Sequence, residues 1–325
     1  MPEFVFATCR AGSEAALKRE VAARHGDLLT PAFMRPQLIT WKARQRLEDR
    51  FELGAVFASV SGRSLGNART VEEVAALMPE AGELHVFPRA SPEDGLDANG
   101  WKPFDALRET LAKLVVKQGD AVLDVIVGGE GEPWFVGTHR QSLWAHPDAG
   151  ALTRVTLPGE APSRAWLKME QALAWAGVGS LAGKVVLELG CAPGGGSYSM
   201  LQCGATVIGV DTGEMDERVL AFPSFTHVAM AAGEYQRTVL PQHVDILVSD
   251  MNLEPNIVLN YVEFLCEQLE PSLLILTLKM NDAKVEAQVP TLLKRIQHFG
   301  PRPVRAKQLP ANRRDICVLA GRLTK

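Results

Sequence analysis

The chain contains few cysteines, and none of them follow a recognisable spacing. Its five cysteines occur along 325 residues without a CxxC motif: Cys9, Cys191, Cys203, Cys266 and Cys317. An odd, scattered set argues against a disulfide framework and against a zinc site built from cysteine. We therefore expect reduced cysteines that serve mainly in packing, and no bound metal.

Long apolar runs are also missing. The longest runs, such as 273–278, are far too short to span a bilayer, and residues 1–10 lack a basic region followed by an apolar stretch. We expect a cytoplasmic protein without a membrane partner. With 46% hydrophobic and 22% charged residues, the composition is typical of soluble globular proteins. The length predicts two or three domains, because one core rarely supports so many residues.

The net charge of −4 does not exclude a nucleic-acid partner, because phosphates respond to local fields. Basic residues gather in one stretch without an intervening acid: Lys294, Arg295, Arg302, Arg305, Lys307, Arg313 and Arg314. This stretch is either a surface that lies along a phosphate backbone or simply a solvated basic face.

The centre of the chain, residues 184–211, has the pattern of a strand, a glycine loop, a helix and a second strand. The apolar run 185–189 stops at Gly190, and the glycines that follow remove side chains that would keep a ligand from the backbone. The strand 206–210 ends on Asp211, which can accept hydrogen bonds from both ribose hydroxyls of an adenosine ligand.

A dinucleotide fingerprint would require glycine where this chain has Ala192, so the GxGxxG spacing is absent. Residues 188–195 instead resemble the LGxxPGG motif of FtsJ-type class I methyltransferases, which use S-adenosyl-L-methionine (SAM). A glycine-rich turn in an ordinary α/β domain is the alternative. The resemblance implies these SAM-binding residues: Glu188, Gly190, Cys191, Ala192, Pro193, Gly194, Gly195, Asp211 and Asp250.

The first 140 residues have the pattern of an α+β module. Strands are expected at 4–9, 38–43, 55–62, 83–88, 121–127 and 134–138, and helices at 13–24, 71–78 and 104–117. The opening CRAGSEAALKREVA resembles the start of THUMP-containing RNA-modifying enzymes. This implies a ferredoxin-like α+β subdomain at 1–66 and a THUMP-like RNA-binding domain at 67–140; an unrelated accessory domain is the alternative. Residues 141–162, rich in proline and glycine, are the expected linker to a Rossmann-like α/β domain at 163–325.

The segment APSRAWLKMEQAL places Lys168 on an expected helix over 163–176. It resembles the segment before the SAM domain in bacterial large-subunit ribosomal RNA cytidine 2'-O-ribose methyltransferases (RlmM type). The strand 244–249 ends on Asp250 and the strand 273–278 on Lys279, so both should lie at the edge where Gly190 lies. Lys168, Asp250 and Lys279 match three members of the K-D-K-E tetrad of that family, and the resemblance places Asp315 at the position of the fourth.

Two residues depart from the family pattern. Asp315 stands where glutamate is expected, and Ala232 stands where the family often has an aspartate that binds the adenine amine. No proline follows Asp250, which disfavours the Asn/Asp-Pro-Pro-aromatic type of base methylation.

The chemistry requires in-line placement of a weak nucleophile, the ribose 2'-hydroxyl, and removal of its proton. Lys279 is the expected general base, Asp250 orients both lysines, Lys168 steadies the hydroxyl and Asp315 holds Lys168. The sequence thus predicts a SAM-dependent 2'-O-ribose methyltransferase acting on RNA, with 23S rRNA or a precursor particle as partner. A catalytically silent RNA-binding relative and a small-molecule O-methyltransferase are the alternatives.

Overall fold

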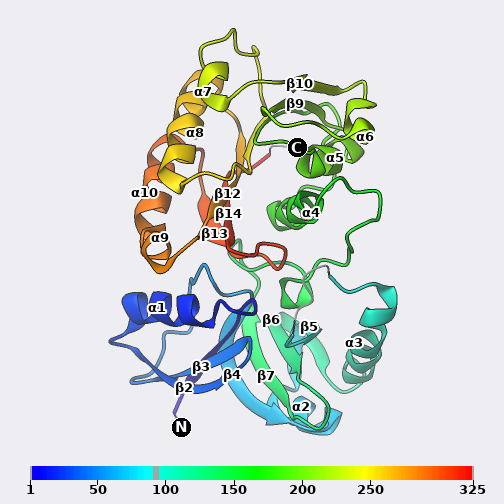
Figure 1. The fold of residues 1–325 in the computed structure, drawn as a ribbon. Coiled ribbons are helices and arrows are strands. Elements are labelled where there is room, and N and C mark those ends of the chain that lie inside the picture. The colour runs from blue at the N-terminus through cyan, green and yellow to red at the C-terminus, as the bar shows by residue number, and fades with distance from the viewer. Residues whose placement is uncertain (1, 91–94, 324–325) are drawn as a thin grey trace. The chain divides into compact units, whose positions relative to one another are not determined.

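A computed structural model describes residues 2–90 and 95–323. The chain divides into two compact units, residues 1–154 and 155–325 (Figure 1). The boundary lies inside the segment 141–162 that was expected to be the linker. Each unit is built on its own seven-stranded sheet. Within the described residues, none of the helices combines the length and apolarity needed to cross a bilayer.

The first unit is a mixed α+β structure. Its elements are β1 (Phe4–Thr8), α1 (Glu14–His25), β2 (Leu29–Arg35), β3 (Leu38–Ala43), β4 (Ser61–Ala68), α2 (Val71–Leu77), β5 (Glu80–Pro88), α3 (Ala98–Leu111), β6 (Val116–Val127), β7 (Trp134–Arg140) and the short 3₁₀ helix η1 (Ala149–Ala151). The strand order is β2-β3-β1-β4-β7-β6-β5. A division of this unit at residue 66 stays a prediction, and it would fall inside β4.

Two local expectations in the first unit were wrong, and one strand was not expected. Residues 55–60 are a buried loop, and the strand begins at Ser61. Helix α3 begins at Ala98 and ends at Leu111, not 104–117, because Asp97 caps it by accepting from Gly100 N and residues 116–117 pair with β5. Strand β2 was not expected, because most of its residues are exposed and it contains Pro31, as edge strands often do.

The second unit has the predicted Rossmann-like α/β fold. Its elements are α4 (Ala165–Ala176), β8 (Val185–Leu189), α5 (Gly195–Gln202), β9 (Thr206–Val210), α6 (Glu217–Leu220), β10 (Phe225–Val228), α7 (Ala232–Tyr235), β11 (Ile246–Ser249), α8 (Pro255–Leu269), β12 (Leu273–Lys279), α9 (Ala283–Ala287), α10 (Val289–Phe299), β13 (Val304–Lys307) and β14 (Asp315–Gly321). The strand order is β10-β9-β8-β11-β12-β14-β13.

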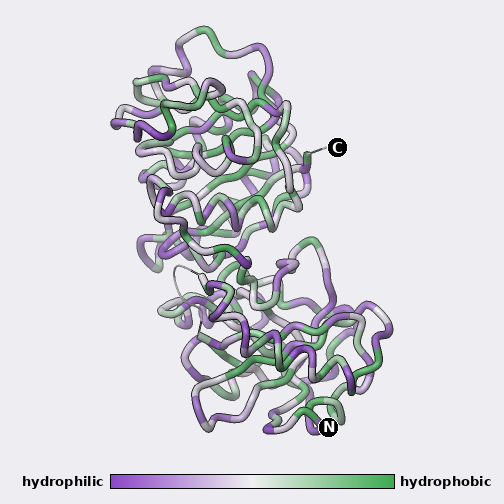
Figure 2. Tube along the Cα trace, turned by 90° about the vertical axis from the view of Figure 1, so that its right-hand side faces the viewer, coloured by the Kyte–Doolittle hydropathy of each residue, from purple (hydrophilic) through white to green (hydrophobic). Residues whose placement is uncertain are grey.

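The first five strands in this order run parallel, from β10 through β9, β8 and β11 to β12. Strand β14 pairs antiparallel with β12. The central strands are mostly apolar because helices cover both faces of the sheet, with Glu188 of β8 as an exception. Helices α4 and α5 lie on one side, and α8 and α10 on the other (Figure 1). Hydrophobic segments run through both units (Figure 2). The core of this unit packs Met169 and Leu173 of α4 with Val186, Val248 and Ile275 of the sheet.

Candidate active site

The residues expected to form the active site gather at one edge of the second sheet. Gly190, Asp250 and Lys279 lie at the carboxyl ends of the adjacent parallel strands β8, β11 and β12. Strand β14 runs in the opposite direction, so its first residue, Asp315, lies directly across from Lys279. Helix α4 supplies Lys168.

The four side chains form a charge-balanced network. Lys168 Nζ donates to Asp315 Oδ2 at 2.7 Å and to Asp250 Oδ2 at 3.4 Å. Lys279 Nζ donates to Asp250 Oδ1 at 3.1 Å and to Asp315 Oδ2 at 3.5 Å. The side chains are between 9% and 18% exposed, so solvent screens these contacts only in part. Each carboxylate therefore serves both ammonium groups.

The environment of Lys168 keeps its ammonium charged. Burial is the largest influence on its pKa and lowers it, but the charges of Asp250 and Asp315 and their hydrogen bonds together outweigh burial and raise the pKa. Lys168 is consequently a cation at neutral pH. It can donate to an oxygen atom but cannot accept a proton.

A second carboxyl lies close to the network. Glu188 of β8 is 2% exposed and accepts a hydrogen bond from Ser197 Oγ. Burial raises its pKa to about 8; the Ser197 hydroxyl opposes the shift, and the negative charges of Asp250 and Asp211 add to it. The carboxyl is therefore mostly neutral at pH 7. Glu188 lines a small cavity together with Lys168, Asp250, Thr277, Asn312 and Cys317 of β14.

The glycine loop is shaped by the protein's own packing. Gly190 has a φ of 79°, and a Cβ there would approach the backbone of Met251 to 2.9 Å. At Gly195 the nearest neighbour is Ser163 Oγ, and at Gly196 it is Glu188 Oε1. A side chain at Gly195 or Gly196 would therefore meet the protein itself. Contacts from the loop to a cofactor stay a prediction.

Asp211 anchors this loop to the end of β9. Its Oδ2 accepts from Ala192 N at 3.0 Å, and its Oδ1 accepts from Gly213 N at 2.8 Å. Pro193 O accepts from Asp216 N at 3.0 Å. Each carboxylate oxygen has a second lone pair, so the side chain can still accept from a ligand. Cys191 is buried against Met215, and burial raises the pKa of its thiol, which makes it a packing residue.

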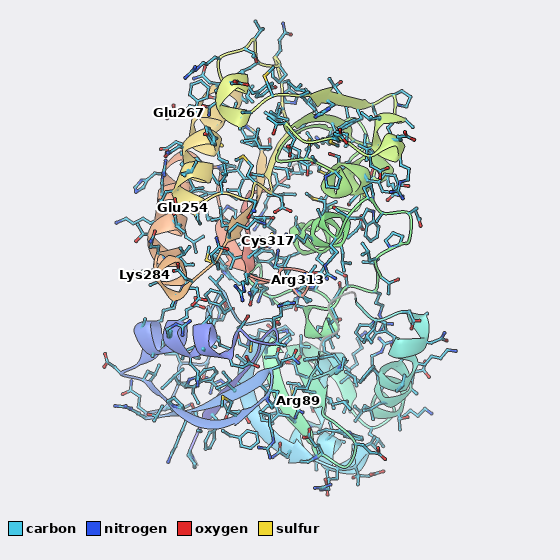
Figure 3. The ribbon with its side chains drawn as sticks, viewed as in Figure 1. Arg89, Glu254, Glu267, Lys284, Arg313 and Cys317 are labelled. Carbon is cyan, nitrogen blue, oxygen red and sulfur yellow. The ribbon has the colours of Figure 1, made fainter. Side chains whose placement is uncertain are left out.

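The basic stretch 294–314 does not form one continuous surface. Arg305 and Lys307 are only 5% and 7% exposed, and Arg305 lies over the Trp175 ring at 4.9 Å. Arg295 pairs with Glu263 on α8. Exposed acids lie at both ends of α8: Glu254 directly precedes its first residue and Glu267 is close to its last (Figure 3). Arg305 and Lys307 are therefore not part of a solvated basic face, and an RNA contact of this stretch stays a prediction.

Sequence reasoning missed several residues that support the site. Ser197 bonds to Glu188, and Ser163 fills the space beside Gly195. Asn312 lines the cavity while its Oδ1 accepts from Leu309 N at 3.0 Å. Asn312 precedes Asp315 by three residues in the final loop, which was a signal that this loop reaches the site.

The chain resembles known proteins in the part that carries three of the four network residues, Lys168, Asp250 and Lys279. The family model for FtsJ-like methyltransferases matches residues 161–295. Ribosomal RNA large subunit methyltransferase M of Pseudomonas savastanoi pv. phaseolicola is 32% identical over 257 residues, covering 70% of this chain and 66% of that protein. The protein of the same name from Alkalilimnicola ehrlichii is 31% identical over 134 residues, covering 39% and 32%. The chain belongs to the RlmM-type methyltransferase family.

The RlmM-type assignment confirms the prediction that SAM is the cofactor. Matches to curated relatives span from 32% to 66% of the relative's own length. Among solved structures, TrmN from Thermus thermophilus is 18% identical with a TM-score of 0.38, covering 98% of this chain and 99% of that one. The THUMP-like nature of the first unit stays a prediction.

Proposed function

We propose that the chain is a SAM-dependent 2'-O-ribose methyltransferase that acts on large-subunit ribosomal RNA, with a cytidine as the target and 23S rRNA or its precursor particle as the partner. The observation that carries this proposal is the network of Lys168, Asp250, Lys279 and Asp315 at the strand ends. Two lysines and two carboxylates in mutual contact can hold a hydroxyl and move its proton. The names of the RlmM-type relatives support RNA as the substrate.

The residues around the glycine loop fit SAM. Asp211 keeps free lone pairs beside the loop, and the positive φ at Gly190 lets the backbone turn where strand β8 ends. We assign the hydroxyls of its ribose to Asp211 and its amino-acid portion to the loop 190–195. SAM supplies a methyl group on a positively charged sulfur, and that charge favours the neutral form of a nearby lysine.

The two lysines have different parts in the reaction. Lys168 has the shortest contact, 2.7 Å to Asp315 Oδ2, and a raised pKa, so it stays charged and donates to the ribose oxygen. Lys279 has longer contacts, 3.1 Å and 3.5 Å, and we assign it the role of general base. Neutral Lys279 then accepts the proton of the 2'-hydroxyl as the methyl group is transferred.

The departure at Asp315 does not remove the fourth contact of the tetrad. Although its side chain is one methylene shorter than glutamate, Asp315 Oδ2 reaches both lysine ammonium groups. This geometry favours an active enzyme over a catalytically silent RNA-binding relative.

The test is a substitution of Lys279 by arginine, with Lys284→Arg on α9 as the matched control. Arginine keeps the charge but stays protonated at every accessible pH, so it cannot accept the ribose proton. Calorimetry should show unchanged SAM binding, while transfer of a tritiated methyl group to rRNA should fall about 10²–10⁴-fold. Wild-type turnover in Lys279→Arg would show that Lys279 is not the base. Equal labelling of extracted metabolites instead of RNA would indicate a small-molecule substrate.

A further inference from the structure

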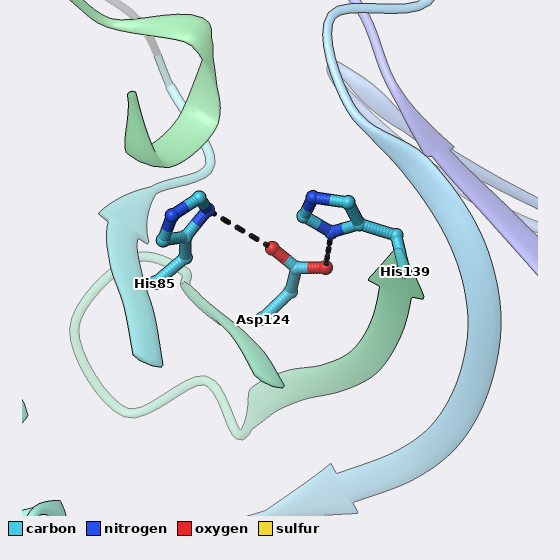
Figure 4. Close-up of side chains that lie close together, drawn as sticks. All are labelled: His85, Asp124 and His139. Carbon is cyan, nitrogen blue, oxygen red and sulfur yellow. Dashed lines mark hydrogen bonds and ion pairs between the residues drawn. The ribbon is translucent and has the colours of Figure 1, made fainter. Parts of the chain in front are cut away.

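A second group of polar side chains lies in the first unit, on three neighbouring strands. His85 belongs to β5, Asp124 to β6 and His139 to β7 (Figure 4). His85 and Asp124 are directly opposite each other in the β5–β6 pairing. Asp124 is opposite Gly137 of β7, and His139 lies two residues further along. Because side chains alternate along a strand, all three point to the same face of the sheet.

The three side chains are close together and shielded from water. One potential ligand atom from each lies within 4.8 Å of the others. His139 Nδ1 is 2.5 Å from Asp124 Oδ2, and His85 Nδ1 is 3.8 Å from Asp124 Oδ1. Asp124 is fully buried, and His85 is 4% exposed. A buried carboxylate requires compensation by hydrogen bonds or positive charge.

The contact between His85 and Asp124 lacks such compensation. Neither His85 Nδ1 nor Asp124 Oδ1 has a hydrogen-bond partner in the described structure. Glu83 Oε1 lies 3.4 Å from the other ring nitrogen of His85, Nε2, and favours the tautomer with its proton there. Nδ1 then presents a lone pair to a carboxylate oxygen that also presents lone pairs. The two atoms are 3.8 Å apart and unsatisfied, and a positive group between them would satisfy both.

We propose that His85, Asp124 and His139 bind one divalent transition-metal cation of the zinc type. Two imidazoles and a carboxylate are a ligand set that such ions accept, and a carboxylate beside the outer nitrogen of a ligating histidine is a common support. Bonds of about 2.0–2.1 Å in tetrahedral geometry separate ligand atoms by about 3.3 Å. The 3.8 Å gap between His85 Nδ1 and Asp124 Oδ1 is close to this value, whereas His139 Nδ1, which is 2.5 Å from the other oxygen, Oδ2, must move to reach the same ion.

The cation would replace the proton that His139 shares with Asp124, and a solvent molecule would complete the coordination. Such a site would link β5, β6 and β7 into one rigid edge of the sheet. An imidazolium–carboxylate pair between His139 and Asp124 is the simpler explanation of their short contact. That pair leaves the facing acceptors of His85 and Asp124 unexplained, and it predicts no affinity for zinc.

Zinc titration of the full chain separates the two explanations. Tag-free protein, first stripped with a chelator, is titrated with Zn²⁺ in competition with a chromophoric chelator. We expect about one zinc per chain in the wild type, and affinity at least about 100-fold weaker in His85→Gln and His139→Gln. His25→Gln is the matched control, because this ring lies on α1 against Phe51 and Leu53. It should bind zinc like the wild type.

Cobalt provides a second measurement that does not depend on the variants. Co²⁺ added to the stripped wild type should produce the visible absorption of a four-coordinate complex, and Zn²⁺ should remove it. Thermal unfolding of the zinc-free proteins shows whether each variant folds. A wild type that binds neither ion at micromolar concentration overturns the proposal, as does undiminished binding by both folded histidine variants. If a variant does not fold, the wild-type stoichiometry and cobalt spectrum decide.

Discussion

Replacing Asp315 by asparagine tests whether one carboxylate holds both lysines of the network. The amide keeps the shape of the side chain, and its oxygen can still accept a hydrogen bond, but the negative charge is lost. Asp250 would then be the single carboxylate facing two ammonium groups. Removing one partner of a buried pair costs about 3–5 kcal/mol, because an uncompensated charge is left behind.

The lower end of this range applies here, because Lys168 and Lys279 are 18% and 13% exposed. We expect a loss of about 3 kcal/mol in the free energy of unfolding, which lowers the midpoint by roughly 6–12 °C for a unit of this size. Methyl transfer should fall as well, since Lys168 loses its closest partner.

The pH dependence of this loss has a definite sign. The pKa of Lys168 is raised in the folded state above its ordinary value of 10.5. Its contribution to stability is therefore fully present below that pH and is lost as pH rises through the folded-state pKa. The difference in the free energy of unfolding between wild type and Asp315→Asn should stay constant, to within roughly 1 kcal/mol, from pH 7 to 9. It should shrink at more alkaline pH.

Hydrogen exchange across a urea series measures this difference in the second unit of the chain, because peptides from β12 and β14 report on that unit alone. Asp216→Asn is the control, because Asp216 forms an exposed pair with Arg218 and should change stability little. Unchanged unfolding and unchanged methyl transfer in Asp315→Asn would refute the view that Asp315 holds the two lysines.

Two further predictions concern the cofactor loop and its buried carboxyl. Asp211→Ala should weaken SAM binding measured by calorimetry by at least about 10-fold, because charge-assisted bonds of about 1.5–3 kcal/mol are lost together with those to Ala192 and Gly213; unchanged affinity would place the ribose elsewhere. Glu188→Gln should match the wild type in urea unfolding near pH 5. It should be more stable by up to about 4 kcal/mol at pH 9, because the pKa raised from 4.5 to about 8 makes wild-type stability fall as pH rises through that window. Parallel pH profiles of the two proteins would argue that Glu188 is charged in the folded state.

The sequence predicted the positions in the active-site network because a simple rule governs them. Parallel strands present their carboxyl ends at one edge, so Asp250 and Lys279 had to lie close together once both strands were recognised. Asp315 was located by resemblance, and the antiparallel register of β14 explains why it meets Lys279.

Other features depend on packing that no local pattern reveals. The charges in 294–314 left open whether the stretch contacts RNA or is a solvated face, and they did not show that β13 buries Arg305 against Trp175. The long stems of arginine and lysine allow this burial, so charge along a sequence does not report exposure. Likewise, the space beside Gly195 is occupied by Ser163 from a preceding segment, 32 residues away.

The group formed by His85, Asp124 and His139 in the first unit also depends on packing that no local pattern reveals. His85 and Asp124 are separated by 39 residues and meet only because β5 and β6 are parallel, which requires the intervening chain to cross over through α3. A shift of that register by one residue would turn Asp124 to the opposite face of the sheet, away from the two histidines. Metal-site motifs search for ligands at short spacing, so a site built from strand register is invisible to them. The register that aligns these buried acceptors is therefore the feature that a bound cation would stabilise.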